Sequence, residues 1–174
     1  MKGNRDEVER GLDLIAHRGP DGRGIASSGE CLHGHVRLAL LDLSDASAQP
    51  FRTDAGVLSF VGEVWNHAGI REELEKAGIG FRTSGDTEVL ARSLERWGVP
   101  SALEKLDGMF AFAWSCRRGD WLVRDRFGKV PLYIVRRGRT FIWSNERRGL
   151  GPDGGKAVAL PPGTVLVLRT GRTS

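Results

Sequence analysis

Three segments in the first half of the chain are predicted to be helices, and hydrophobic positions recur with helical spacing in the first of them. Val8, Leu12 and Ile15 are three or four residues apart and lie among charged residues, a pattern typical of a short amphipathic helix. Asp86 is well placed as an N-cap, with Thr87 and Glu88 in the first turn that follows. Helices are therefore predicted over residues 6–16, 67–77 and 86–97.

The second half of the chain, after Gly108, consists of short apolar runs separated by basic turns. The runs are MFAFAWS, DWLVRDR, PLYIVRRGR, TFIWSN and TVLVLRT. One run every ~8–12 residues is the signature of an antiparallel sheet or sandwich. Earlier strands are predicted over 31–43 and 57–64, a turn over 17–24 and a flexible loop over 149–156. Helices between strand groups indicate an α+β fold, in one domain over 1–174.

Composition and charge exclude several classes of protein. The net charge of +4 comes largely from arginine pairs, which are expected at hairpin turns, and no nucleic-acid motif accompanies them. No apolar run approaches the ~20 residues of a membrane helix, and the charged start is unlike a secretory signal. Two cysteines without a CxxC motif favour a reducing compartment. We therefore expect a cytoplasmic protein that binds neither nucleic acid nor membrane.

Seven segments in order carry a resemblance to a known family. They are HRGPDGRG, GHVRLALLDLSDASAQPF, GEVWN, FRTSGDTEVL, LDGMFAFAW, VRDRFGKVPLY and LPPGTVLVL. Together they resemble the class II glutamine amidotransferase domain of asparagine synthetases, over nearly the whole chain. The resemblance implies the αββα four-layer sandwich of N-terminal-nucleophile (Ntn) hydrolases.

The resemblance also implies substrate-binding roles. Arg37 matches the arginine that pairs with the glutamine α-carboxylate, a contact that suits the planar fork of a guanidinium group. Glu63 and Asp86 match the acidic residues that hold the α-ammonium group. Leu40 and Leu41 match the strand that lines the pocket.

The residues that would react depart from the family pattern. In the family, an N-terminal cysteine attacks the glutamine amide, and an asparagine and a glycine hold the oxyanion. Gly62 matches that glycine, but Val61 stands in place of the asparagine and offers no donor. Position 2 is Lys2, and residues 1–10 do not resemble the family's apolar first strand. We therefore expect a sandwich whose first strand is truncated or missing, and no catalytic residue.

The alternating residues Cys31, His33, His35 and Arg37 share a strand face with the inferred pocket, and their side chains suggest two other chemistries. Cys31 could replace the nucleophile, or the Cys-x-His-x-His run could bind a metal. Residues two apart on a strand are ~7 Å apart, too far for three ligands on one straight strand to share a zinc ion. We expect neither a metal nor a cofactor.

The leading hypothesis is a stand-alone, glutaminase-deficient amidotransferase-like domain. It would bind a synthetase-type ATP-dependent amide-forming partner or a glutamine-like amino acid. The alternative is an active glutaminase that hydrolyses glutamine to glutamate and ammonia once an N-terminal cysteine segment is supplied. A third hypothesis is a structural subunit with a closed pocket. An open sheet edge also predicts pairing with a second copy or with a strand of another chain.

Overall fold

The computed structural model describes residues 4–38 and 45–170. The helices are α1 (Arg5–Leu14), α2 (His67–Lys76) and α3 (Asp86–Lys105), and the 3-10 segments are η1 (Ala16–Arg18), η2 (Asp45–Ser47) and η3 (Arg147–Lys156). The strands of the first half are β1 (Gly22–Ser28), β2 (Cys31–Arg37), β3 (Phe51–Arg52) and β4 (Gly56–Val64). Those of the second half are β5 (Gly108–Cys116), β6 (Gly119–Arg124), β7 (Tyr133–Arg137), β8 (Thr140–Ser144), β9 (Val158–Ala159) and β10 (Val165–Thr170).

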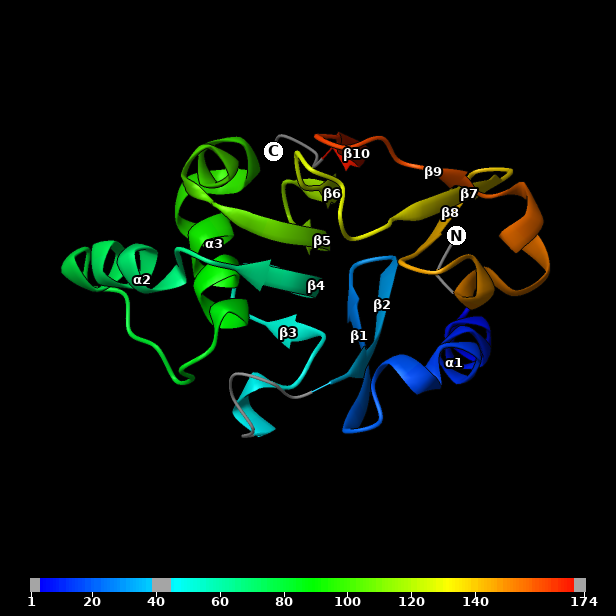
Figure 1. The fold of residues 1–174 in the computed structure, drawn as a ribbon, viewed down its shortest axis with the longest axis horizontal. Helices are drawn as coiled ribbons and strands as arrows, with labels where there is room; N and C mark the ends of the chain where they lie inside the picture. The colour runs from blue at the N-terminus through cyan, green and yellow to red at the C-terminus, as the bar shows by residue number, and fades with distance from the viewer. Residues whose placement is uncertain (1–3, 39–44, 171–174) are drawn as a thin grey trace.

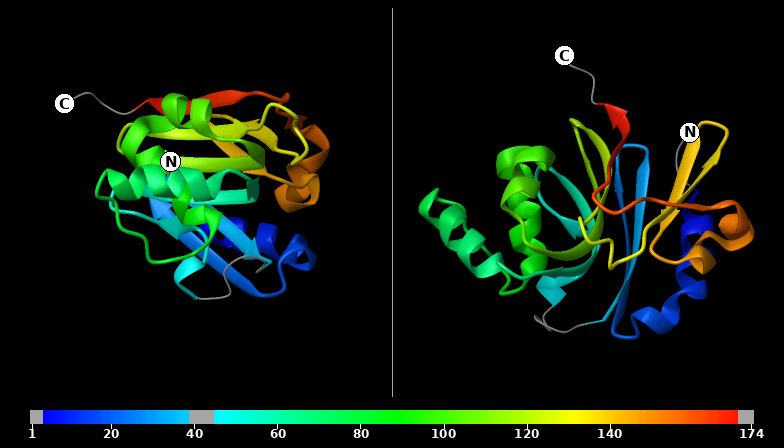
Figure 2. Two further views of the ribbon diagram at one scale, coloured as in Figure 1. Left: turned by 60° about the vertical axis from the view of Figure 1, so that its left-hand side comes forward. Right: turned by 45° about the horizontal axis from the view of Figure 1, so that its top comes forward.

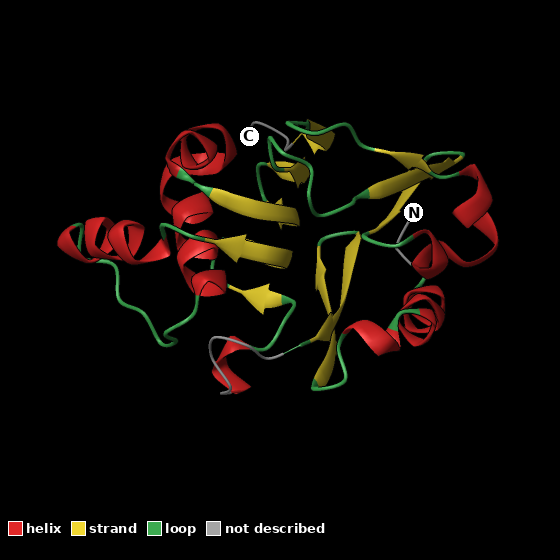
Figure 3. Cartoon of the chain, viewed as in Figure 1, coloured by secondary structure: helices red, strands yellow, loops and turns green. Residues whose placement is uncertain are grey.

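The strands form three antiparallel groups that make two layers. One layer is a five-stranded sheet in the order β10-β6-β5-β4-β3, and the other contains the β1-β2 hairpin and the three strands β8-β7-β9. Figure 1 shows α2 and α3 on the outer side of the five-stranded sheet, with α1 and η3 at the opposite side of the molecule. Figure 3 shows the same order by element type, helices outside and strands inside. The expected α+β sandwich is therefore present.

The central strand β5 separates two hydrophobic cores by its alternating side chains. Phe110, Phe112 and Trp114 belong to the core on the helix side, where α2 and α3 pack. Ala111 and Ala113 belong to a smaller core between the two strand layers. The residues of a strand point alternately to its two faces, so large side chains fill the helix side and small ones the interlayer side.

Several local predictions differ from the structure. The third predicted helix breaks where expected, because Gly98 has φ 77°, but helical residues resume and α3 ends at Lys105. The predicted turn over 17–24 is wrong in its second part, since β1 begins at Gly22. The predicted flexible loop over 149–156 is mostly 3-10 helical. None of the helices in the described part of the chain is both long and apolar enough to span a membrane.

The prediction that Asp86 is an N-cap is also wrong. Gly85 occupies the N-cap position and Asp86 is the first residue of α3. The Asp86 carboxylate instead accepts a hydrogen bond from the Val64 backbone N–H, 2.9 Å away at the end of β4. The side chain therefore joins the start of α3 to the end of β4.

Candidate functional site

A large pocket lies between the two strand layers. Its volume is about 1240 Å³, and we call it the interlayer pocket. Arg37, Gly62, Glu63 and Asp86 all line it. They come from three elements, because Arg37 ends β2, Gly62 and Glu63 lie near the end of β4, and Asp86 begins α3. The expected lining residues Leu40 and Leu41 lie outside the described residues.

Backbone and side-chain contacts position Arg37. The Asp21 backbone N–H donates to the Arg37 carbonyl at 3.0 Å, which ties the segment before β1 to the end of β2. The guanidinium Nη2 donates to the Ser47 hydroxyl at 2.5 Å. Arg37 lines the interlayer pocket, and the planar fork of a guanidinium group suits a bidentate contact with a carboxylate.

Asp86 and Glu63 form an acidic pair at the same end of the pocket. Asp86 is 5% exposed, and burial raises the pKa of its carboxyl group. The Val64 N–H and the nearby His67 ring oppose that rise in pKa, whereas the charge of Glu63 adds to it. Two carboxylates close enough to repel each other are stabilised by a cation between them. With Arg37, they provide the charges that complement an α-amino acid zwitterion.

Val61 and Gly62, which precede Glu63 on β4, also line the pocket. The Val61 side chain packs against the interlayer core of Ala111 and Ala113. It presents only methyl groups to the pocket, so it can donate no hydrogen bond to an oxyanion. Gly62 has φ 125°, a conformation that its register opposite Phe110 on β5 maintains.

His33 and His35 point from β2 toward β4 and are held as neutral rings. His33 hydrogen bonds through Nδ1 to Ser59 Oγ (3.2 Å) and through Nε2 to Ser115 Oγ (2.8 Å). His35 Nε2 bonds to the Phe60 carbonyl at 3.1 Å. Burial is the main cause that lowers the pKa of each histidine to about 4. Within residues 4–38 and 45–170, no three His, Cys, Asp or Glu side chains are grouped to hold a metal.

These buried histidines predict a loss of stability in mild acid. Because the folded-state pKa is lowered, the unfolded chain takes up protons first as the pH falls below about 6.5, and the difference is complete near pH 4. At pH 5 each histidine should reduce the free energy of unfolding by about 2 kcal/mol relative to pH 8. Urea unfolding of the wild type and of His35→Asn at pH 5 and pH 8 measures this change in the free energy of unfolding. The variant should lose about 2 kcal/mol less than the wild type between these pH values. An equal loss in both proteins would contradict the prediction.

Neither cysteine lies at the Arg37 end of the pocket. Cys31 lines the pocket at the start of β2, six residues from Arg37, which is roughly 20 Å along a strand. Cys116 is buried in the core on the helix side of the five-stranded sheet. The distance argues against Cys31 as a replacement nucleophile.

Ser47, Gln49 and Trp143 are among the pocket residues that were not singled out from the sequence. Ser47 and Gln49 lie in the segment that connects β2 to β3, and both line the pocket. Gln49 Oε1 accepts from the Phe60 N–H at 2.8 Å and so connects this segment to β4. Trp143 of β8 also lines the pocket and meets the His33 ring edge-on, with 5.8 Å between ring centroids. No periodicity marks these residues, because their positions depend on how distant segments meet.

The chain matches the family model described as "Glutamine amidotransferase domain" over residues 1–166. It belongs to this family. The amidotransferase domain is 34% identical over 161 residues to an asparagine synthetase [glutamine-hydrolyzing] of Asparagus officinalis, covering 90% of this chain and 27% of that protein. It is 31% identical over 152 residues to asparagine synthetase [glutamine-hydrolyzing] 3 of Bacillus subtilis (strain 168), covering 84% of this chain and 24% of the relative. The domain thus spans about a quarter of the length of these curated relatives.

Solved structures place the amidotransferase domain in the same fold. It is similar to glutamine phosphoribosylpyrophosphate (PRPP) amidotransferase from B. subtilis complexed with ADP and GMP, with a TM-score of 0.77 and 26% identity. That match covers 94% of this chain and 44% of the other. The predicted family, a class II glutamine amidotransferase domain of the asparagine synthetase type, is confirmed, as is the α+β fold of the Ntn-hydrolase type.

Proposed function

We propose that this domain binds glutamine or a closely similar α-amino acid in the interlayer pocket and is deficient in hydrolysing it. Arg37 would hold the α-carboxylate, and Glu63 and Asp86 the α-ammonium group. The observation that carries the proposal is the convergence of these three charged side chains on one pocket from β2, β4 and α3. Gly62 would contribute backbone to the lining around the ligand.

The proposed deficiency rests on two positions. Val61 stands where the family places the oxyanion asparagine, and loss of one such donor costs roughly 3–4 kcal/mol of transition-state stabilisation. Cys31 lies at the opposite end of β2 from Arg37. The relatives named as glutamine-hydrolyzing support the alternative, an active glutaminase, so activity has to be measured directly.

Calorimetric titration of the domain with glutamine, glutamate and asparagine tests the ligand proposal. Arg37→Ala should weaken binding by about 10- to 100-fold, because a charge-assisted bond to a carboxylate is lost. Arg136→Ala is the matched control, since Arg136 is exposed on β7 and does not line the pocket. If none of the three amino acids binds, or if both variants bind equally, the ligand proposal is wrong.

Ammonia release from glutamine tests the deficiency separately. We expect no turnover from the wild-type domain, whereas turnover with ordinary saturation kinetics would show an active glutaminase. In that case Val61→Asn should raise the rate further, because it restores a donor to the oxyanion position.

We also propose that the domain acts beside an ATP-dependent amide-forming polypeptide of the asparagine synthetase type. The support is that the named relatives are asparagine synthetases of which this domain matches about a quarter. Mixed with such a polypeptide, the domain should co-elute with it in size-exclusion chromatography. Separate elution at concentrations well above micromolar would contradict the partnership.

A further inference from the structure

The wall of the interlayer pocket beside Glu63 is built from apolar side chains. On β4, Val61 and Glu63 are two residues apart, so they face the same side of the sheet at a separation of about 7 Å. Their partners across the β4-β5 ladder are Ala111 and Met109, respectively. All four residues line the pocket. A side chain that extends along β4 from an α-carbon held near Glu63 therefore meets Val61, Met109 and Ala111.

The segment between β6 and β7 adds to this wall. It crosses from the five-stranded sheet to the β7-β8 pair, as the right-hand view of Figure 2 shows. Val130 and Leu132 of this segment belong to the same interlayer core as Ala111, and both also line the pocket. The name apolar wall is used below for the five residues Val61, Met109, Ala111, Val130 and Leu132.

Hydrogen bonds within the protein hold the crossing segment in place. The guanidinium group of Arg124 donates through Nε to the Val130 carbonyl (2.9 Å) and through Nη2 to the Gly128 carbonyl (2.5 Å). The Leu132 carbonyl accepts from the Leu160 N–H at 2.8 Å. The apolar wall is therefore formed before a ligand enters, and its ordering does not reduce the binding affinity.

Two polar side chains next to the apolar wall are bonded to the backbone of Phe60, the residue before Val61. Gln49 Oε1 accepts from the Phe60 N–H at 2.8 Å, and His35 Nε2 bonds to the Phe60 carbonyl at 3.1 Å. The other ring nitrogen of His35, Nδ1, is buried. The amide oxygen of Gln49 and the Nε2 of His35 are thus already used within the protein.

A ligand side chain that ends in an amide is poorly matched to these surroundings. When an amide is buried, its carbonyl oxygen and its N–H groups need hydrogen-bond partners to replace water, and affinity is lost where a partner is missing. The side chains of the apolar wall carry no N–H or O–H donor. An apolar side chain of similar length has no such requirement and gains affinity from the area that it buries. The flexible thioether of methionine is such a group.

We propose that the interlayer pocket selects an α-amino acid with an uncharged, apolar side chain of about methionine's length, and that Val61 determines this preference over glutamine. The inference rests on the proposed function, because Arg37, Glu63 and Asp86 have to hold the α-carboxylate and α-ammonium groups. A ligand with a carboxylate side chain is the least suitable, since that charge would be buried without a partner beside Glu63.

Calorimetric titrations of the intact chain with single amino acids test the preference. Methionine should bind at least about tenfold more tightly than glutamine, and glutamate more weakly than either. Norleucine, in which a methylene replaces the sulfur of methionine, should share the advantage over glutamine, because the contact is apolar and not specific to sulfur.

Substitutions at Val61 test its role. Val61→Asn adds a donor and an acceptor to the apolar wall, so it should shift the ratio of the two affinities toward glutamine by at least about tenfold. Val61→Thr keeps the shape of valine, adds one hydroxyl group and should shift the ratio in the same direction. Val158→Asn is the matched control, because Val158 is exposed and does not line the pocket, and its ratio should stay within about twofold of the wild type. Circular dichroism confirms that each variant is folded.

The outcomes separate this preference from the proposed function. If glutamine binds as tightly as methionine, or if norleucine binds no more tightly than glutamine, the apolar preference is wrong while amino-acid binding stands. If the folded Val61 variants keep the wild-type ratio, the assigned role of Val61 is wrong. If none of the amino acids binds, the proposed function is wrong, and the preference with it.

Discussion

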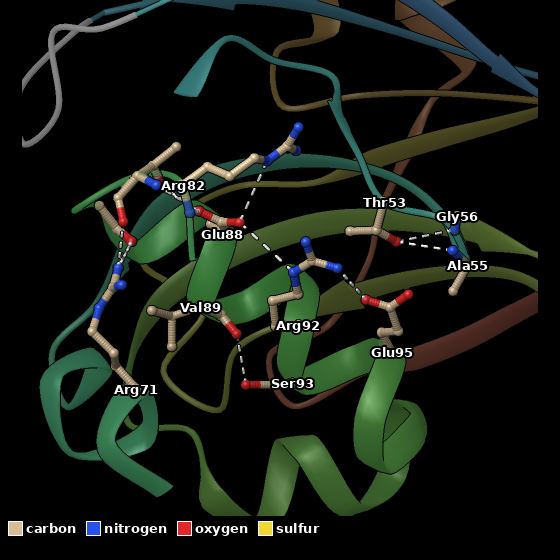
Figure 4. Close-up of polar contacts among 12 residues, drawn as sticks. Thr53, Ala55, Gly56, Arg71, Arg82, Glu88, Val89, Arg92, Ser93 and Glu95 are labelled. Atoms are coloured by element: carbon tan, nitrogen blue, oxygen red, sulfur yellow. Dashed lines mark hydrogen bonds and ion pairs between the residues drawn. The ribbon is translucent and has the colours of Figure 1, made fainter. Parts of the chain in front are cut away.

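Glu88→Ala is expected to lower the free energy of unfolding by about 3–5 kcal/mol, because it removes a buried charge that several groups depend on. The Glu88 side chain has no exposed surface. Its Oε2 accepts hydrogen bonds from the Arg82 N–H (2.9 Å), the Thr83 N–H (2.8 Å) and the Thr83 hydroxyl (2.8 Å). Figure 4 shows Glu88 between this segment and Arg92, whose Nε lies 3.7 Å from Glu88 Oε1. Alanine would leave the donors of Arg82 and Thr83 without a partner.

Glu95→Ala is the matched control, because Glu95 also pairs with Arg92, at 2.9 Å, but is partly exposed. It should cost less than about 1 kcal/mol. Chemical unfolding of the two variants and the wild type measures the difference. Comparable losses in both variants would show that burial of Glu88 has no special role. Since Glu88 anchors the segment that leads into Asp86, we also expect Glu88→Ala to weaken amino-acid binding.

Gly62→Ala should be the second most damaging of these substitutions, with a loss of about 3 kcal/mol or more in the free energy of unfolding. The φ of 125° is outside the range that alanine adopts readily. A Cβ at this position would overlap the Met109 carbonyl oxygen and lie 2.7 Å from the Phe110 Cα on β5. These are backbone atoms in the middle of a sheet, so they cannot move aside without disturbing the β4-β5 register.

Gly69→Ala is the same chemical change as Gly62→Ala, but it is expected to stabilise the protein. Gly69 is in α2, and a Cβ built there has no heavy atom within 4 Å. Alanine should therefore stabilise the protein by about 0.5–1 kcal/mol through its higher helix propensity. Thermal and urea unfolding of both variants give the comparison. A tolerated Gly62→Ala would mean that the backbone at this end of β4 relaxes easily.

Residue patterns predicted the helices better than the strands. The apolar spacing of Val8, Leu12 and Ile15 predicted α1, and Gly98 interrupts α3 where the predicted helix ends. β1 was missed because its first residues, Gly22 to Gly24, belong to a glycine-rich segment that is typical of a turn. Its strand conformation depends on pairing with β2, which local sequence does not encode.

The site was predicted through the family resemblance, and periodicity alone would not have found it. Arg37, Glu63 and Asp86 line one pocket, but their roles toward a ligand stay predictions. Ser47 and Gln49 could not be chosen, because their contacts with Arg37 and Phe60 form only when the connecting segment returns to the sheet.

The helices on the two sides of the sandwich differ greatly in how many of their residues are buried. α3, which packs against α2 and the five-stranded sheet, has nine buried residues, whereas Leu12 is the single buried residue within α1. Local opening costs least where few apolar contacts must be broken. We therefore expect α1 and the β1-β2 hairpin to separate from the molecule in a subglobal unfolding step while the helical side stays native. The domain would then behave as a rigid half that carries Glu63 and Asp86 and a looser half that carries Arg37.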